Sequence, residues 1–214
     1  MANTTALSPQ LLAETSQWLV FFKPSGWLTI PGRKSQNDPT PDFPVLSDWV
    51  KTSYGPVWTV HRLDLHTSGV ILFAKTSGDH QLANDWFENR KVKKRYIFLA
   101  SGSLKFPVVK VNEPIEGKRC VTQIESLEKF GDLFLGAAIP LTGRRHQIRI
   151  HLAKEGHPIL GDALYGGRSE HEGCTFNRVA LHAQKLELPD GVYFEAPLPE
   201  DFMDWLTHLR GKNK

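Results

Sequence analysis

The chain has 214 residues, of which 40% are hydrophobic and 23% charged, and a formal net charge of +3 at pH 7. These values are ordinary for a soluble globular domain with a substantial core, and the small net charge does not by itself indicate a nucleic-acid ligand. The sequence has no apolar run long enough to cross a bilayer and no signal-peptide pattern in its first twenty residues. We therefore expect no membrane partner and a cytoplasmic location. Cys120 and Cys174 lack metal or redox spacing, which fits a reducing compartment.

The N-terminal part begins with polar residues and continues into an apolar run. Residues 1–16 predict a flexible lead-in to a domain that spans 17–210. Residues 18–22 predict a strand, which ends at turn residues 23–26. Residues 32–44 are rich in turn formers and predict an exposed loop. A short helix is expected over about 45–53, with three apolar residues at helical spacing.

The central part contains two apolar, β-branched runs, 57–60 and 70–74, which predict buried strands on either side of a polar loop. Ser77 is the expected N-cap of a helix over about 78–90. The expected apolar face of this helix consists of Leu82, Ala83, Trp86 and Phe87. Residues 95–100 predict the next strand.

The C-terminal part predicts a hairpin, two more strands and two helices. The expected elements are strands at 119–130 and 133–140 around Gly131-Asp132, a helix from Gly143 to about Glu155, a polar loop at 166–176, strands at 178–188 and 192–196, and a last helix over about 200–209 that buries Phe202, Trp205, Leu206 and Leu209. This succession predicts an α+β domain with a mixed, mainly antiparallel sheet flanked by helices.

Basic residues cluster in two places. One cluster comprises Arg90, Lys91, Lys93, Lys94 and Arg95, and the other comprises Arg144, Arg145 and Arg149. A basic stripe is the electrostatic footprint of a phosphate backbone, but it also fits a solvated face. The first cluster further suits the end of the helix before it, where cations complement the helix dipole.

The loop at 61–69 is the strongest candidate for chemistry, because loops held between rigid strands often carry function. Arg62 and Asp64 lie two residues apart, Thr67 and Ser68 can bond to the loop backbone, and Gly69 is available for a tight turn. An Arg-x-Asp in such a loop is also compatible with an ordinary surface pair.

Asp64 and Arg149 form a candidate pair. A guanidinium in contact with Asp64 would hold the carboxylate ionised and orient its oxygens, which suits a nucleophile or a base. The alternative is a structural ion pair. On a helix, Arg149 would face the same side as Arg145, four residues earlier. His146 and Gln147 could then bond a base or a phosphate.

The other candidate residues have simpler alternatives. Tyr96 in its strand is compatible with a core residue or with a ring that stacks on an extruded base. The pairs His61 and His66, and His146 and His151, have no third ligand at metal spacing, so we expect no metal site. No phosphate-binding P-loop, dinucleotide fingerprint or nucleophile elbow occurs in the sequence.

Two motifs together resemble the RluA-type family of pseudouridine synthases. They are His61-Arg62-Leu63-Asp64-Leu65-His66-Thr67-Ser68-Gly69 and Gly143-Arg144-Arg145-His146-Gln147-Ile148-Arg149-Ile150-His151. The likeness extends over about 18–188 and includes 22–26, 94–96 and 178–183. It implies that the α+β domain is a single pseudouridine-synthase catalytic domain with a central RNA-binding cleft.

The resemblance also implies roles for individual residues. Asp64 falls on the family nucleophile, Tyr96 on the active-site tyrosine and Arg149 on the conserved cation. Arg62 would enter the space that the uridine leaves and hold phosphate, while Leu181 would supply an apolar wall. The remaining expected RNA-binding residues are His61, Thr67, Lys94, Arg95, Arg144, Arg145, His146 and Gln147. Arg145 departs from the family pattern, which usually has a small polar residue there.

The implied reaction isomerises uridine to pseudouridine in ribosomal or transfer RNA. It needs no cofactor, and the uridine must leave its stack for Asp64 to reach it. We expect a monomeric member without the S4 RNA-binding domain, since the match starts near residue 18. Two alternatives remain: an RNA-binding protein or RNA-folding chaperone with the same fold, and a hydrolase that uses the Asp64 loop, which lacks a second acid or a metal site.

Overall fold

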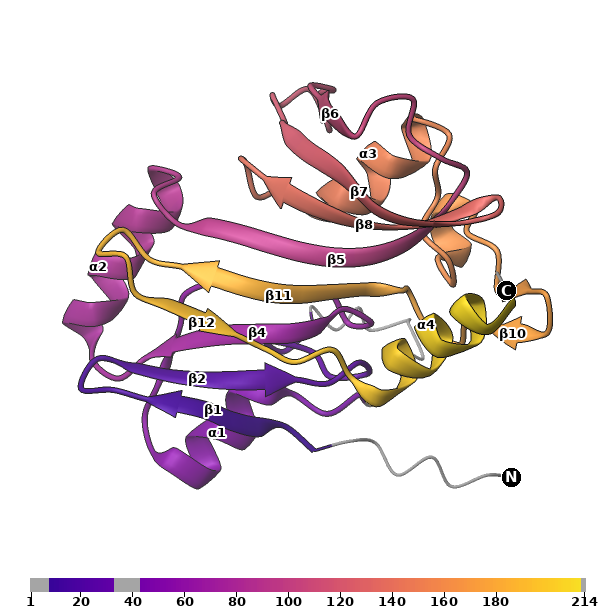
Figure 1. Cartoon of the computed structure of the whole chain (residues 1–214). Coiled ribbons are helices and arrows are strands. Elements are labelled where there is room, and N and C mark those ends of the chain that lie inside the picture. The colour runs from indigo at the N-terminus through magenta and orange to yellow at the C-terminus, as the bar shows by residue number, and fades with distance from the viewer. Residues whose placement is uncertain (1–7, 33–42, 213–214) are drawn as a thin grey trace, which may run out of the picture.

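The computed structural model describes residues 8–32 and 43–212. Its centre is a ten-stranded sheet in which eight strands follow the order β1-β2-β4-β11-β5-β8-β7-β6, while β3 pairs with β4 and β12 with β11 (Figure 1). The strands are β1 Gln10–Glu14, β2 Trp18–Lys23, β3 Trp58–Thr59, β4 Ser68–Ala74, β5 Lys93–Ser101, β6 Val108–Val111, β7 Thr122–Phe130, β8 Leu133–Pro140, β11 Leu181–Glu187 and β12 Tyr193–Glu195.

Four helices accompany the sheet in the described part of the chain. They are α1 Leu46–Tyr54, α2 Ser77–Glu88, α3 Gln147–Lys154 and α4 Glu200–Lys212. A short 3-10 helix, Ala163–Tyr165, and a small hairpin of β9 Glu170–His171 and β10 Cys174–Thr175 follow α3. In Figure 1, α2 lies at one end of the sheet and α4 near the other. No helix among the described residues combines the length and apolarity needed to span a membrane.

The sheet is mixed and mainly antiparallel, as predicted. Within the described residues β4 and β11 form its one parallel pair, and the other strand pairs of the sheet are antiparallel. Because β11 lies between β4 and β5, residues from distant parts of the sequence become neighbours at the middle of the sheet. This arrangement brings the 61–67 loop beside the start of β11.

Strands β2 and β4 are buried on both faces, which explains their continuous apolar runs. In β2, Trp18, Val20 and Phe22 pack in one cluster with Ala83 of α2. The alternate residues of β2 pack in a second cluster, in which α1 contributes Leu46. The two strands therefore form a rigid support for the loop between β3 and β4.

A third cluster joins β5, β8 and β11 to the C-terminal helices. The four residues of α4 predicted to be buried are indeed buried: Phe202, Trp205, Leu206 and Leu209. Helix α3 adds Ile148 and Leu152 to the same core. This packing fixes the position of α3, which carries Arg149, relative to the sheet.

Gly69 does not make the tight turn that its sequence suggests. It lies inside β4 with φ of 129°, and a Cβ atom there would stand 2.2 Å from the carbonyl oxygen of Ala183. The glycine therefore permits the close approach of β4 and β11 at the foot of the candidate site.

Several predicted boundaries are wrong. Residues 10–14 form β1 rather than part of a flexible lead-in, because their backbone pairs with β2; residues 1–7 lie outside the described part of the chain. Thr76, not Ser77, caps α2 by accepting a hydrogen bond from the backbone nitrogen of Asp79. Leu82 on that helix is 38% exposed.

The third helix also begins later than the sequence predicts. Residues 143–146 form a loop, and α3 starts at Gln147 after His146, which has a left-handed φ of 54°. Gly156 has φ of 82° just past the helix end, as expected for a C-terminal stop. Most of the exposed loop predicted at 32–44 lies outside the described residues.

Candidate active site

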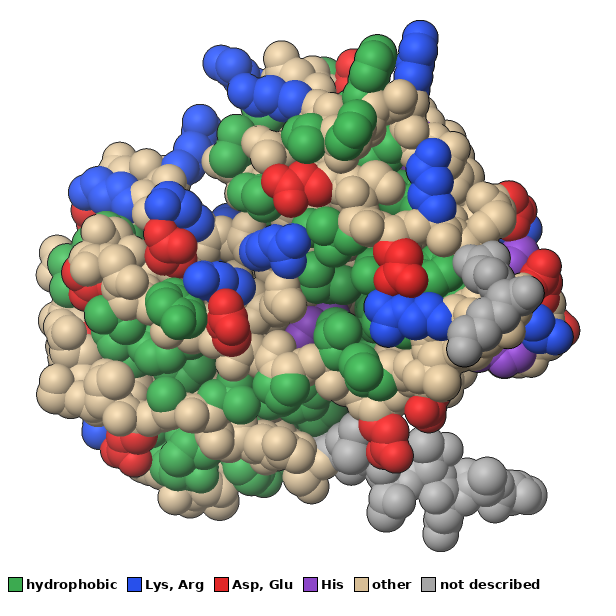
Figure 2. Space-filling view, in the orientation of Figure 1, with side chains coloured by type: hydrophobic (Ala, Val, Ile, Leu, Met, Phe, Trp, Pro, Cys, Tyr) green, Lys and Arg blue, Asp and Glu red, His purple; other side chains and the backbone are tan. Residues whose placement is uncertain are grey.

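A cleft of about 1140 Å³ opens over the middle of the sheet. Its lining includes nine Lys or Arg residues and two carboxylates: Arg62, Arg90, Lys93, Lys94, Lys110, Arg119, Arg144, Arg145 and Arg149, with Asp64 and Glu88. Figure 2 shows Lys and Arg side chains on both sides of the notch between the end of α2 and the β6–β7 region. The cleft is therefore strongly biased toward a polyanion.

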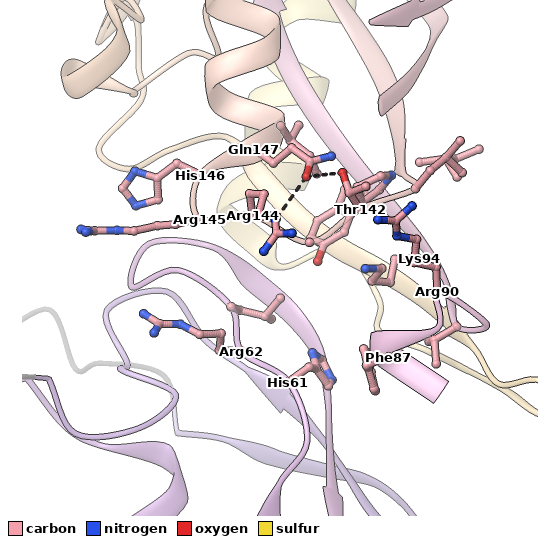
Figure 3. A pocket seen from close by; sticks show the side chains of 18 of the residues that line it. His61, Arg62, Phe87, Arg90, Lys94, Thr142, Arg144, Arg145, His146 and Gln147 are labelled. Atoms are coloured by element: carbon pink, nitrogen blue, oxygen red, sulfur yellow. Dashed lines mark hydrogen bonds between the residues drawn. The ribbon is translucent and has the colours of Figure 1, made fainter. Parts of the chain in front are cut away.

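All but one of the residues predicted for the site line this cleft. They come from the 61–67 loop, the end of α2, the start of β5, the 142–147 loop with α3, and the start of β11. In Figure 3 Arg62 and Arg145 extend from opposite walls toward the same end of the site, while Arg90 and Lys94 lie at the other end.

Asp64 stands in a tight turn with its side chain 24% exposed. The backbone nitrogen of Thr67 donates to the Asp64 carbonyl over 3.1 Å, which closes the turn. The next carbonyl, of Leu65, accepts from the backbone nitrogen of Gly26 and from the ammonium of Lys23. The turn is thus anchored at its backbone, and the carboxylate remains accessible from the cleft.

Lys23 is fully buried under this turn. Its ammonium donates to the carbonyl oxygens of Pro24, Trp27 and Leu65 at 3.0, 2.7 and 3.1 Å. Burial lowers the pKa of Lys23 to about 7, although the charge of Asp64 acts in the opposite direction. Lys23 therefore ties the end of β2 to the residue that follows Asp64.

Arg149 forms the expected ion pair with Asp64, but its bidentate hydrogen bonds go to Asp162. Its Nε and Nη2 donate to the Asp162 oxygens at 2.6 and 2.7 Å. Its Nη1 lies 3.7 Å from Asp64 Oδ2, an ion pair rather than a hydrogen bond. Burial alone would lower the pKa of Arg149, but the bonds and charge of Asp162 raise it overall.

The burial of Asp162 explains why Arg149 directs its two hydrogen bonds there. The Asp162 side chain is only 1% exposed, so an ionised carboxylate there requires a buried partner. The ring of Tyr165 covers the guanidinium, with 5.0 Å between the Arg149 Cζ atom and the ring centroid. Arg149 is thus held from one side and presents Nη1 to Asp64.

His146 forms the other contact to Asp64. Its Nε2 lies 3.7 Å from Asp64 Oδ1, and its Nδ1 is 3.0 Å from the Tyr165 hydroxyl. Burial lowers the pKa of His146, Asp64 opposes this shift, and Arg149 with Arg145 reinforces it. Because α3 begins only at Gln147, Arg145 lies in the loop and does not share a helix face with Arg149.

Tyr96 and Leu181 form the floor of the cleft beneath the Asp64 loop. Leu181 is buried in β11 and pairs with β5 at Phe98. Tyr96 is half-buried in β5. Burial, and secondarily the charge of Asp64, raise the pKa of its hydroxyl above the ordinary value. Tyr96 therefore stays protonated at neutral pH.

Lys94 and Arg95 point to opposite faces of β5, as successive strand residues must. Lys94 lines the cleft beside Tyr96, with its ammonium 6.0 Å from the Phe87 ring centroid, and burial lowers its pKa. Arg95 instead donates to Gln184 over 2.6 Å and does not line the cleft. The predicted RNA contact of Arg95 therefore stays a prediction that this cleft does not support.

The side chain of Gln147 makes four hydrogen bonds within the protein. Its side-chain oxygen accepts from Thr142 Oγ1 and the Arg144 backbone nitrogen, and its amide donates to Val121 and Thr122. Two of these bonds are drawn in Figure 3. The four contacts occupy the amide, so the structure does not support the predicted contact between Gln147 and RNA. Gln147 instead holds the 142–147 loop at the cleft wall.

The remaining predicted residues differ in accessibility. Arg62, Arg144 and Arg145 are exposed, whereas Thr67 is 2% exposed. His61 stacks on Phe87 and accepts a hydrogen bond from the Leu72 backbone, and burial lowers its pKa to about 3. His61 therefore remains neutral and supports the wall between β4 and α2.

Sequence reasoning missed three side chains of the site: Lys23, Asp162 and Tyr165. Lys23 lies among the turn residues 23–26, but nothing local in the sequence marks the partners of any of the three. The glycine before Asp162 is explained only by the structure, where a Cβ at Gly161 would stand 2.0 Å from the Arg178 carbonyl oxygen. No group of three or more potential metal ligands occurs among the described residues.

The arrangement defines a basic cleft in which the accessible carboxylate of Asp64 lies near an arginine, a histidine and a tyrosine. Residues 17–154 match the family described as RNA pseudouridylate synthase. The chain belongs to this family of RNA-modifying isomerases.

Similar proteins with names indicate the subfamily. The chain is 31% identical to the dual-specificity RNA pseudouridine synthase RluA of Escherichia coli (strain K12), over 87% of this chain and 92% of RluA. It is 32% identical to the uncharacterized RNA pseudouridine synthase YhcT of Bacillus subtilis (strain 168), over 89% of this chain and 69% of YhcT. The solved structure of human RNA pseudouridylate synthase domain containing 1 superposes with a TM-score of 0.73 and 25% identity, covering 98% of this chain and 90% of that one. The chain is an RluA-type pseudouridine synthase.

Proposed function

We propose that this protein isomerises specific uridines of ribosomal or transfer RNA, with Asp64 as the catalytic carboxylate. The observation that carries the proposal is the accessible Asp64 side chain in a cleft that also presents Tyr96, Arg149 and nine basic residues in all. The volume of about 1140 Å³ exceeds the roughly 300–1,000 Å³ usual for small-molecule pockets, in keeping with a polymer substrate.

The reaction exchanges one bond for another within the nucleotide. The N1–C1′ bond breaks, the uracil turns, a C5–C1′ bond forms, and the proton on C5 is removed while N1 gains one. Asp64 acts on the ribose, either by attack at C1′ or by removal of the C2′ proton. Neither route requires an electron carrier or a group donor.

The surrounding residues supply positioning and charge. The uridine leaves its stack to reach Asp64, and Arg62, exposed at the cleft mouth, fills the space it vacates and holds phosphate. Tyr96 lies under the uracil. Arg149 and His146, each 3.7 Å from Asp64, orient its carboxylate.

The test is a pseudouridine map of total RNA from cells with and without the gene. We expect sites that vanish in the deletion, return with the wild-type gene and do not return with Asp64→Asn. Restoration by Asp64→Asn would remove Asp64 from the mechanism. If no site depended on the gene, the RNA-binding or chaperone alternative would be favoured, and crosslinking would then identify the bound RNA.

A further inference from the structure

A second pocket, of about 510 Å³, opens beside the cleft. The two cavities share five lining residues: Arg62, Asp64, Arg145, His146 and Arg149. The shared residues form a wall, which we call the Asp64 wall. A ligand with its reacting atoms at Asp64 in the cleft can therefore continue directly into the second pocket.

The lining of the second pocket is mixed, and its apolar members can contact a flat ring. They are Leu28, Leu65, Ala163, Leu164 of the short 3-10 helix, and Val179. Leu164 is 66% exposed, the largest exposed fraction among the large hydrophobic residues. Single exposed leucines are common, but this one belongs to a pocket next to the reactive carboxylate.

Two polar side chains in this pocket can bond the edge of a base. Asn177 is exposed, and its side-chain amide makes no hydrogen bond to another described residue. His66 is also exposed, and burial of its ring together with Lys23, Arg149 and Arg178 lowers its pKa, which keeps the imidazole neutral. A neutral imidazole and an amide each offer a donor and an acceptor.

Two cations flank the passage between the cavities. Arg62 and Arg145 are exposed and line both of them. Figure 3 shows the two side chains reaching from opposite walls toward the same end of the site. An RNA strand that extends from the cleft into the second pocket would have a phosphate near both guanidinium groups. Guanidinium groups bind phosphate oxygens well.

We propose that the second pocket binds the nucleotide next to the target uridine, with the intervening phosphate between Arg62 and Arg145. This inference rests on the proposed function and specifies its substrate class. Two consecutive nucleotides must leave the stack together, so the substrate is a uridine in a single-stranded loop rather than one flipped singly from a continuous helix.

The experiment uses the full-length protein and a synthetic hairpin RNA that carries a mapped target uridine. Two further hairpins have an abasic nucleotide at the 5′ or at the 3′ neighbour of that uridine. We expect one of the two abasic hairpins to raise KM by about tenfold, on the order of the loss of one stacked base. The kcat value should change little, because the reacting nucleotide is intact.

Variants connect this loss to the pocket. Leu164→Ala should raise KM for the unmodified hairpin by several-fold and reduce the further effect of the abasic substitution, because the two changes remove the same contact. Leu127→Ala is the matched control, since Leu127 is an exposed leucine of β7 outside both cavities. It should leave KM unchanged.

Equal KM values for all three hairpins, or fully additive effects of Leu164→Ala and the abasic site, would overturn the inference. If the unmodified hairpin gave no pseudouridine, the proposed function would fail instead. Binding of the same RNAs, followed by fluorescence anisotropy, tests the pocket independently of turnover. Equal affinities of the wild-type protein for the intact and both abasic hairpins would exclude the pocket as a nucleotide site.

Discussion

Two loops bring a carboxylate to Arg149, and they use it differently. The loop between α3 and the 3-10 helix places Asp162 in the interior, where both oxygens bind the guanidinium at 2.6 and 2.7 Å. The loop between β3 and β4 places Asp64 at the cleft, 3.7 Å from the same arginine and 24% exposed. The first carboxylate is committed to the fold, and the second remains available to a ligand.

This difference separates positioning from chemistry. A buried pair with good geometry holds Arg149 in one orientation, because breaking it would leave a charge without a partner. Asp64 then experiences a fixed positive charge without losing its oxygens to hydrogen bonds. Lysines differ in the same way: the Lys23 ammonium is used by three backbone carbonyls, whereas Lys93, Lys94 and Lys110 line the cleft.

The sharpest test exchanges each carboxylate for its amide. Asp64→Asn should lower pseudouridine formation by at least about a thousandfold and change the free energy of unfolding by less than about 0.5 kcal/mol. Asp162→Asn should destabilise the protein by about 3 kcal/mol, because Arg149 loses its buried counter-charge. Urea unfolding and product formation measure the two effects. Equal losses of stability in both variants would break the comparison.

Tyr96, like Asp64, lines the cleft and is available to a ligand. Tyr96→Phe keeps the ring and removes the hydroxyl, so if the hydroxyl assists removal of the C5 proton, turnover should fall about a hundredfold with little change in RNA affinity. Single-turnover rates and binding constants separate the two quantities. An unchanged rate would restrict Tyr96 to stacking.

Lys23, like Asp162, is a buried charged residue whose polar groups bond within the fold. Its pKa is about 7 in the fold, below the ordinary value of 10.5, so the unfolded chain binds more protons between these values. The contribution of Lys23 to stability is therefore fully present above pH 10.5 and is lost progressively as pH falls from 10.5 to about 7.

This dependence appears in a comparison with Lys23→Met. Between pH 7 and 9 the wild type should gain stability relative to the variant by up to about 1.4 kcal/mol per pH unit. Denaturant unfolding at each pH measures the difference. A difference that does not vary with pH would mean that Lys23 keeps an ordinary pKa.

The smallest expected effect distinguishes the two faces of β5. Lys94→Ala should reduce the salt dependence of RNA binding by about 0.7–0.9 in the slope of log K against log salt, because Lys94 lines the cleft. Arg95→Ala is the control, since its guanidinium binds Gln184 on the other face. Binding titrations at several salt concentrations give both slopes, and equal changes would place Arg95 on the RNA.

The sequence was sufficient for the sheet and for the accessible part of the site. The apolar runs that flank residues 61–67 predicted a rigidly held loop, and both faces of β2 and β4 are buried accordingly. It was insufficient for Lys23, because full burial of a lysine needs three carbonyl partners that only the tertiary fold assembles. The predicted ion pair of Arg149 with Asp64 is present at 3.7 Å. Its bidentate partner, Asp162, was missed because it lies beyond the end of α3 and only the tertiary fold buries it against Arg149.

Arg95 lies outside the cleft for a different reason. Its strand was predicted, and alternation along a strand already requires that Arg95 and Tyr96 face opposite sides. The cluster of charges in the sequence concealed this, because adjacent basic residues suggest one surface. Periodicity would have been the better guide.

The insertion of β11 between β4 and β5 has a consequence for how the protein forms. Residues 68–101 supply two strands that are close in the chain, yet they meet only through a strand that begins at Leu181. A nascent chain emerging from the ribosome therefore carries incompletely paired edges on β4 and β5 until β11 has been synthesised. Closure over so long a segment slows folding and leaves those edges open to other partners. The cleft should consequently form in one late step, when β11 joins β4 to β5.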